Sequence, residues 1–315
     1  MNKKAKKKNP LKLKACAVAL SLWGLSAVLA LSSSPVMAAD TASNTAQEPV
    51  AGALFFKGVV LDKLHRYEEA IAAYNDLITR FGNSQDTKIQ EVVAMALFSK
   101  GVALGNLHRY EEALAAFNDL LTRFGNSQDT TIQEVVAKAL GNKGVALDKL
   151  HRYEEAIAAY NDLITRFGNS QDQDIQEPVA NALNNKGVDL GSLHRYEEAL
   201  AAYNDLITRF GNSHDPKIQE AVAKALGNKG VALESLHRYE EAIAAYNDLI
   251  TRFGNSQDTT IQEVVAMALF SKGVDLRSLH RIGQARADLE ELVYRFKDNP
   301  DVDIQKTVAT ARHLL

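Results

Sequence analysis

Cysteine, tryptophan and proline are scarce in this chain. Its 315 residues include one cysteine, one tryptophan and six prolines, and both Cys16 and Trp23 lie within residues 1–38. Beyond residue 38, the sequence therefore excludes a disulfide, a cysteine nucleophile and a cysteine-ligated metal. Hydrophobic residues make up 46% of the chain and charged residues 24%, which is the composition of a globular protein and not of a disordered or fibrous one.

Acidic residues are absent from residues 1–38, a segment that carries seven lysines. The rest of the chain holds 29 basic and 39 acidic residues, so the net charge of −3 becomes −10 once this segment is set aside. This negative net charge disfavours nucleic acids and anionic membrane surfaces as partners, because both carry negative charge.

Residues 1–38 have the pattern of a signal peptide. A lysine-rich stretch precedes an uncharged apolar run, residues 15–31, and Val36 and Ala38 are small enough for the −3 and −1 sites of a signal peptidase. We predict cleavage after Ala38, a linker over residues 39–45, export to the periplasm and no integral membrane domain. The alternative is an inner-membrane anchor formed by residues 15–31, although a spanning helix needs about 20 apolar residues.

A 43-residue repeat fills the chain after the linker. The pair His-Arg recurs at this fixed interval, with its histidine at His65, His108, His151, His194, His237 and His280. We place six repeats within residues 46–303, namely 46–88, 89–131, 132–174, 175–217, 218–260 and 261–303. A fixed period of this length predicts a stacked array in which each repeat buries its apolar face against its neighbours.

Each repeat has the pattern of two helices. In the third repeat, apolar and small residues recur at three- and four-residue intervals over 132–147 and again over 153–167. The sequence predicts that His151-Arg152 forms the turn between the two helices.

Helix ends can also be predicted. We expect Gly168 to end the second helix as a C-terminal glycine. Pro49 and Pro178 are expected in a first helical turn, where proline costs little. A last helix over 304–315 is predicted to cover the exposed edge of the sixth helix pair.

The spacing of Leu140, Gly144, Tyr153, Ala156 and Tyr160 resembles that of the tetratricopeptide repeat family. The phrases Ala-Leu-x-Asn-x-Gly and Arg-Tyr-Glu-Glu-Ala are also typical of it. Small residues at Gly144 and Ala156 would let the two helices approach closely, and Tyr160 would fill the space above them. The resemblance covers 46–303 and implies an all-α fold, a right-handed α-solenoid of six helix–turn–helix repeats with a C-terminal capping helix.

Three patterns suggest chemistry but fit structural roles better. Equivalent histidines of stacked repeats would lie about 10 Å apart, whereas zinc–nitrogen bonds are about 2.0–2.1 Å long, so we interpret the histidines as turn residues. The pair Glu154-Glu155 recurs at the start of a helix, where carboxylates favour the helix dipole. Asn126, Asp129 and Glu134 lack the spacing of a calcium loop. We predict no catalytic residue, no metal site and no cofactor.

Comparison of the six copies locates their variation on one face of the first helix, within a sector of about 120°. The family resemblance implies that this face lines a concave groove that binds extended peptides. Drift at exposed positions is the alternative, but clusters of apolar residues at exposed positions usually mark binding sites. The predicted groove residues are Phe55, Phe56, Met95, Phe98, Lys138, Asn142, Asn181, Asn184, Asn185, Lys224, Asn228, Met267 and Phe270.

The predicted groove has apolar ends and a polar middle. Asn142, Asn185 and Asn228 occupy equivalent positions, and their amides could bond the main chain of an extended segment. By the family resemblance, valines stand where the family's carboxylate clamp uses asparagine, so we predict binding to an internal or apolar segment and not to an acidic C-terminal tail. These valines are Val145, Val188 and Val231. Lysines in the middle would favour a ligand with some negative charge. The competing interpretation is that Phe55, Phe98 and Phe270 pack inside the protein against the neighbouring repeat.

The sequence therefore predicts a non-enzymatic scaffold of the bacterial cell envelope that binds a protein or peptide, with the partner unidentified. Two alternatives remain open. One is an assembly factor associated with a polysaccharide or with murein, and the other is an accessory subunit of an envelope enzyme.

Overall fold

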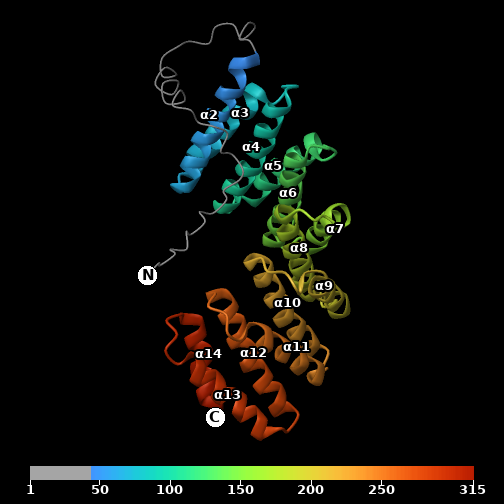
Figure 1. Ribbon diagram of the computed structural model, residues 1–315, viewed down its shortest axis with the longest axis vertical. Helices are drawn as coiled ribbons and strands as arrows, with labels where there is room; N and C mark the ends of the chain where they lie inside the picture. The colour runs from blue at the N-terminus through green and yellow to red at the C-terminus, as the bar shows by residue number, and fades with distance from the viewer. Residues whose placement is uncertain (1–43) are drawn as a thin grey trace, which may run out of the picture. The chain divides into compact units, whose positions relative to one another are not determined.

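The computed structural model describes the backbone of residues 44–315 and the side chains from residue 47 onward. The predicted signal peptide and the predicted linker up to residue 43 lie outside the described residues. The described part of the chain forms thirteen helices and no strand. Figure 1 shows how these helices follow one another along the chain. These helices are α2 (Asn44–Lys63), α3 (Tyr67–Phe81), α4 (Thr87–Asn106), α5 (Tyr110–Phe124), α6 (Thr130–Lys149), α7 (Tyr153–Phe167), α8 (Gln173–Ser192), α9 (Tyr196–Phe210), α10 (Pro216–Ser235), α11 (Tyr239–Phe253), α12 (Thr259–Ser278), α13 (Ile282–Phe296) and α14 (Val302–Leu314).

The helix pairs confirm the predicted all-α repeat fold. Each repeat supplies a first helix of 20 residues and a second helix of 15 residues, as α6 and α7 illustrate. The first helix begins about two residues earlier than the repeat boundaries drawn from the sequence, because an aspartate caps it. Asp129, for example, accepts a hydrogen bond from the backbone N–H of Ile132 at 3.0 Å.

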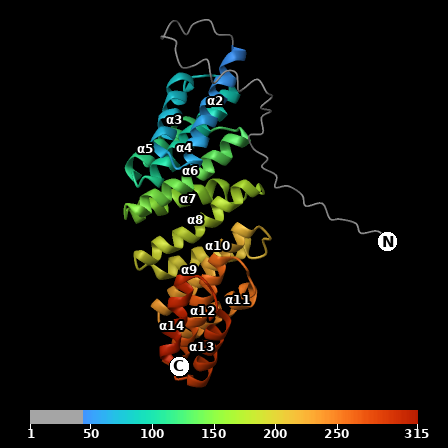
Figure 2. The ribbon, with the colours of Figure 1, turned by 90° about the vertical axis from the view of Figure 1, so that its left-hand side faces the viewer.

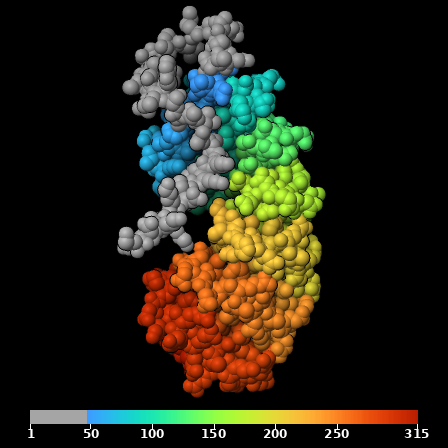
Figure 3. Space-filling view, viewed as in Figure 1, coloured from blue at the N-terminus to red at the C-terminus, as the bar shows by residue number. Residues whose placement is uncertain are grey.

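The chain divides into two compact units, Met1–Val93 and Ala94–Leu315, with the boundary inside α4. In the first unit, α2 packs on α3. In the second unit, a first helix such as α8 packs on its own second helix, on the preceding second helix and on the neighbouring first helices α6 and α10 (Figure 2). The space-filling view shows the successive repeats of this unit as bands that follow one another in chain order (Figure 3).

Close packing within a repeat depends on one glycine and one large side chain. A Cβ atom built on Gly144 would overlap the ring of Tyr160, and the same holds for Gly187 with Tyr203. Tyr160 is fully buried. The prediction that small residues let the two helices approach is therefore confirmed.

The turn between the two helices is made by histidine. All six histidines of the His-Arg pairs have φ between 57° and 59°, and no described glycine has a positive φ. Histidine is among the non-glycine residues enriched in this left-handed region. The Nδ1 atom of His151 lies 2.8 Å from the hydroxyl of Tyr153, so its own repeat holds the ring. The predicted turn role is confirmed.

Of the two predictions about helix ends, one holds in part and one is wrong. Gly168 does follow the last residue of α7 as its C-cap, but its φ of −60° is right-handed, so it ends the helix without the left-handed conformation typical of a C-terminal glycine. Its carbonyl accepts a hydrogen bond from Arg209 of the next repeat at 3.2 Å. Pro49 and Pro178 lie at the sixth residue of α2 and α8, beyond the first turn, because both helices begin earlier than expected.

The last helix, α14, packs on α12 and α13 at the end of the second unit. Ile304, Val308 and Ala311 are buried there. The helix begins at Val302, where Asp301 caps it, two residues before the predicted start.

Candidate binding face

One face of the first helices in the second unit carries a row of exposed valines. Val145, Val188, Val231 and Val274 hold the same position in four consecutive repeats, and they are between 37% and 48% exposed. Neighbouring first helices pack directly on one another, so these side chains follow each other across α6, α8, α10 and α12. We call them the valine row.

A second row lies one helical turn before the valine row. It consists of Asn142, Asn185, Asn228 and Ser271, each three residues before a valine. Side chains three residues apart share a helix face, so the two rows run side by side. We call the three asparagines of this row the amide row.

The asparagine side chains form hydrogen bonds within the protein, and each can form further hydrogen bonds. The Nδ2 atom of Asn142 donates to the carbonyl of Lys138 in its own helix at 2.9 Å, and Nδ2 of Asn228 donates to Oδ1 of Asn184 at 3.1 Å. Each bond uses one of the two N–H groups of an amide, whose oxygen can also accept. The remaining N–H and oxygen are suited to a peptide main chain.

Asn184 does not lie on this face, although the sequence placed it in the groove. It is 7% exposed and lies between α8 and α10. Its Nδ2 atom donates to Asn185 at 3.2 Å, and its oxygen accepts from Asn228. Asn184 therefore supports two members of the amide row and is not a contact residue.

The lysines of this face are paired within their own helices. Nζ of Lys224 lies 2.6 Å from Glu220, and Nζ of Lys138 lies 4.0 Å from Glu134. These partners reduce the attraction that the sequence predicted for a negatively charged ligand. Asn181 and Met267 are exposed on the same face.

The phenylalanines of the predicted groove combine packing with exposure. The ring of Phe55 lies 6.1 Å from that of Tyr74, and the ring of Phe98 lies 6.2 Å from that of Phe117. Phe55 and Phe98 are half-buried against the second helix of their own repeats. Met95 and Phe270 are also half-buried. Their predicted role as anchors stays a prediction.

The first unit has an exposed apolar stripe of its own. Phe56, Val60 and Leu64 are all exposed and are spaced four residues apart along and just beyond α2. Residues four apart lie above one another on a helix. The sequence analysis predicted Phe56 as a groove residue but did not include Val60 or Leu64. Their spacing of four residues from Phe56 could have indicated that they share its helix face.

The valine row was also missed as a contact surface. Valine holds this position in all six repeats, and a position that never varies suggests packing in the core. The exposed fraction in the structure shows otherwise for four of the six copies. Sequence comparison had noted three of these valines only as replacements for a clamp asparagine.

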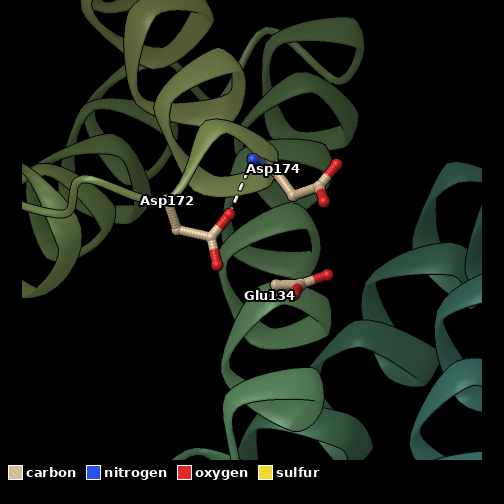
Figure 4. Close-up of side chains that lie close together, drawn as sticks. All are labelled: Glu134, Asp172 and Asp174. Carbon is tan, nitrogen blue, oxygen red and sulfur yellow. Dashed lines mark hydrogen bonds between the residues drawn. The ribbon is translucent and has the colours of Figure 1, made fainter. Parts of the chain in front are cut away.

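Three carboxyl groups meet at the start of α8. Oxygen atoms of Glu134 from α6, of Asp172, which precedes α8, and of Asp174 from α8 lie within 4.8 Å of one another. Figure 4 shows these three side chains close together. Asp172 also caps α8 by accepting from the N–H of Asp174 at 2.9 Å. Burial raises the pKa of Glu134, and Lys138 lowers it. Carboxylate oxygens of this kind can hold a hard cation such as Ca²⁺.

The next repeat offers an internal comparison for this acidic cluster. There Lys217 stands where Asp174 does, and its Nζ lies 2.8 Å from Glu177. The sequence grouped Glu134 with Asn126 and Asp129 of the preceding loop. The structure brings it to the following repeat instead, because first helices pack side by side.

None of the helices described is long and apolar enough to cross a membrane.

Comparison with known proteins agrees with the fold. Three models of the tetratricopeptide repeat match residues 51–83, 92–171 and 178–254, which together are more than half of the chain. None of the curated protein sequences is significantly similar to this chain.

Several solved structures share its arrangement of helices. The apo form of RapI has a TM-score of 0.61 at 15% identity, and the match covers 84% of this chain and 75% of RapI. PilF of Pseudomonas aeruginosa has a TM-score of 0.53 at 15% identity, covering 84% and 99%. PilW, a type IV pilus biogenesis factor, has a TM-score of 0.54 at 15% identity, covering 82% and 98%. At this identity the likeness concerns the fold alone.

Proposed function

We propose that this chain, which belongs to the tetratricopeptide repeat family, is a non-enzymatic scaffold that holds an extended protein segment against its first helices. Tetratricopeptide repeats generally serve as protein-interaction modules. The observation that carries the proposal is the valine row, four exposed apolar side chains in register beside the amide row. Apolar residues that are exposed together in this way usually mark a binding site.

The spacing of the rows suggests the conformation of the ligand. Packed helices lie about 8–10 Å apart. A polyproline II segment rises about 3.1 Å per residue with three residues per turn, so every third side chain advances about 9 Å on the same side. A β-strand places such residues on opposite faces. The proposed ligand therefore carries an apolar side chain at every third residue, and its carbonyls accept from the amide row.

The proposed location is the bacterial cell envelope. This part of the proposal rests on residues 1–38, whose lysines, apolar run and small residues before Ala39 have the pattern of a cleaved signal. PilW, which shares the fold, is a type IV pilus biogenesis factor, and an envelope role is compatible with that example.

A peptide library tests the proposed ligand directly. Peptides with leucine at every third position should bind, whereas peptides of the same composition with leucine at every second position should bind at least about tenfold more weakly. Peptides that end in Glu-Glu-Val-Asp should not bind, since valines occupy the place where the family's carboxylate clamp uses asparagine. Equal binding of both leucine spacings would contradict the proposal.

Paired variants test the proposed face. Val188→Glu with Val231→Glu introduces charge into the middle of the valine row and should abolish binding of the leucine peptides. Val302→Glu is the matched control, because Val302 is an exposed valine at the first residue of α14, a helix that carries no residue of the valine row. If both proteins keep the wild-type affinity and the wild-type helical content, the ligand does not bind at the valine row.

A further inference from the structure

Two first helices carry an acid inside their packed interface. Asp189 of α8 is 1% exposed and Asp275 of α12 is 3% exposed. The same position is Ala146 in α6 and Ala232 in α10. A buried carboxylate is unfavourable unless it is paired or neutralised, so these two acids need an explanation that the repeat fold does not supply.

We call the packed interface between two consecutive first helices a joint. Asp189 faces another acid across the joint between α6 and α8. The Asp148 carboxyl of α6 interacts with it through a side-chain hydrogen bond and through charge. Two carboxyl groups can share such a bond only when one of them is protonated. Tyr160 of α7 and Tyr203 of α9 also face Asp189. The basic group nearby is Lys149, which is half-exposed and lies 3.3 Å from Asp148.

Asp275 has the same arrangement in the joint between α10 and α12. It faces Glu234 of α10 through a side-chain hydrogen bond and through charge. Glu234 in turn accepts a hydrogen bond from the hydroxyl of Tyr246 of α11 at 2.6 Å. The Oδ2 atoms of Asp189 and Asp275 are buried and make no hydrogen bond within the described protein.

Other charged groups at the neighbouring helices have partners of their own. They neutralise one another locally. Their bonds are Lys217 with Glu177 at 2.8 Å, Lys272 with Asp288 of α13 at 3.0 Å, and Arg277 with the Leu314 carbonyl of α14 at 2.7 Å. Among the described residues Asp148 keeps its ion pair with Lys149, and Asp189, Glu234 and Asp275 form no ion pair with a lysine or arginine.

The joint between α8 and α10, which lies between the α6–α8 joint and the α10–α12 joint, has no acid at either of the two positions. Between α8 and α10, the equivalent residues are Gly191 and Ala232. Within the second unit, each joint from α6 to α12 thus has acids on both sides or on neither side. This pairing within one chain indicates that the two acids of a joint function together.

We propose that each acid joint, Asp148–Asp189 and Glu234–Asp275, holds one shared proton and acts as a proton-operated latch between consecutive first helices. With the proton in place, the two carboxyl groups hydrogen bond and the helices stay packed. When the proton leaves for solvent, two carboxylates face each other in a buried joint and repel. The change alters the spacing of the valine row at its first and third intervals and leaves the middle interval as it was.

The direction of the pH dependence follows from burial. Burial, assisted by the neighbouring acid, raises the pKa of Asp189 to about 7 and the pKa of Asp275 to about 7. An unfolded aspartate ionises near a pKa of about 3.9, so the folded state binds more protons than the unfolded state between about pH 4 and pH 7. The stability of the acid joints falls as the pH rises through this window and stays low above it.

Hydrogen exchange of the free protein tests the latch without any ligand. Amide protection, corrected for the intrinsic exchange rate, is compared at about pH 5.5 and about pH 8 in the wild type and in Asp189→Asn. The wild type should lose about tenfold protection in α6 and α8 at the higher pH, and Asp189→Asn should keep it. Asp205→Asn is the control, since it removes an exposed acid of the same repeat that pairs with Arg209.

In the same way, Asp275→Asn should keep the amide protection of α10 and α12 at the higher pH. If Asp189→Asn folds poorly, Asp189→Ala replaces it in the experiment, because the equivalent residue of α6 is Ala146. Protection that does not depend on pH in the wild type would overturn the latch, as would the same pH dependence in Asp189→Asn. If calcium restores the protection of the wild type at about pH 8 to its value at about pH 5.5, the carboxyl pair is a cation site and the proton latch is wrong.

Discussion

The joint between α6 and α8 and the joint between α8 and α10 are built on the same backbone but differ inside. Both use first helices of 20 residues and the same contact of a glycine with a tyrosine ring. One joint contains Asp148 and Asp189, and the other contains Gly191 and Ala232. The repeat fold is therefore specified by the glycine–tyrosine contact and the apolar core, and the joint interior can acquire a separate chemistry without a change of fold.

The largest effect is expected when an acid enters the neutral joint. Ala232→Asp buries a carboxyl group opposite Gly191, where no second carboxyl can share its proton. We expect a loss of about 3 kcal/mol in the free energy of unfolding at about pH 8, measured by urea denaturation, and a smaller loss at about pH 5. A loss below about 1 kcal/mol at both values would mean that the joint is open to water.

Removal of the acids from the α6–α8 joint should have the opposite effect. Asp148→Ala with Asp189→Ala makes the joint resemble its neutral neighbour and removes the groups whose shared proton is lost as the pH rises. We expect a gain of about 2 kcal/mol at about pH 8 and almost none at about pH 4, because the raised pKa of Asp189 acts only above the unfolded value. Thermal melting across this range measures the slope. A gain that is constant with pH would assign the effect to packing alone.

Substitutions in the turns that follow α6 and α8 should lower the free energy of unfolding by similar amounts. His151 and His194 have φ of 57° and 59°, and alanine is unfavourable there. His151→Ala and His194→Ala should each cost about 1 kcal/mol, whereas the glycine variants should be close to wild type. Melting temperatures of the four variants provide the comparison. Unequal costs would show that the joints differ in more than their acids.

The smallest effect is expected from the ion pairs between second helices. Arg195 lies 3.1 Å from Glu154, and Arg238 lies 3.2 Å from Glu197. These side chains are exposed, so Arg195→Ala and Arg238→Ala should each lower the free energy of unfolding only slightly, with the effect reduced by salt. Urea denaturation at low and high ionic strength checks this. A larger, salt-independent loss would show that the arginine stems pack on the neighbouring helix.

Most of the fold could be predicted from the sequence because the repeat makes its periodicity unmistakable. The helices, the His-Arg turn and the close approach at Gly144 were all predicted. The role of Gly168 was not, because residue type alone does not show that Arg209 of the next repeat reaches its carbonyl. The start of α8 was misplaced because the cap at Asp172 was overlooked.

The candidate site was harder to predict, because exposure depends on contacts between repeats. Asn184 varies like a surface residue, yet it is buried between α8 and α10. Valine never varies at its position in the first helix, yet four of its six copies are exposed. Asp189 and Asp275 could have been noticed as acids at an alanine position of the copies. Their pairing with Asp148 and Glu234 depends on which helices are neighbours.

Photo-crosslinking in intact cells tests the central claim, that the first-helix face binds a protein segment. A photoreactive amino acid is placed at Val231 on α10 or, as the control, at Val302 on α14, and both positions are exposed. The account predicts a discrete protein adduct from position 231, competed by a peptide with leucine at every third residue, and no such adduct from position 302. Equal adducts from both positions, or an adduct from position 302 alone, would contradict it.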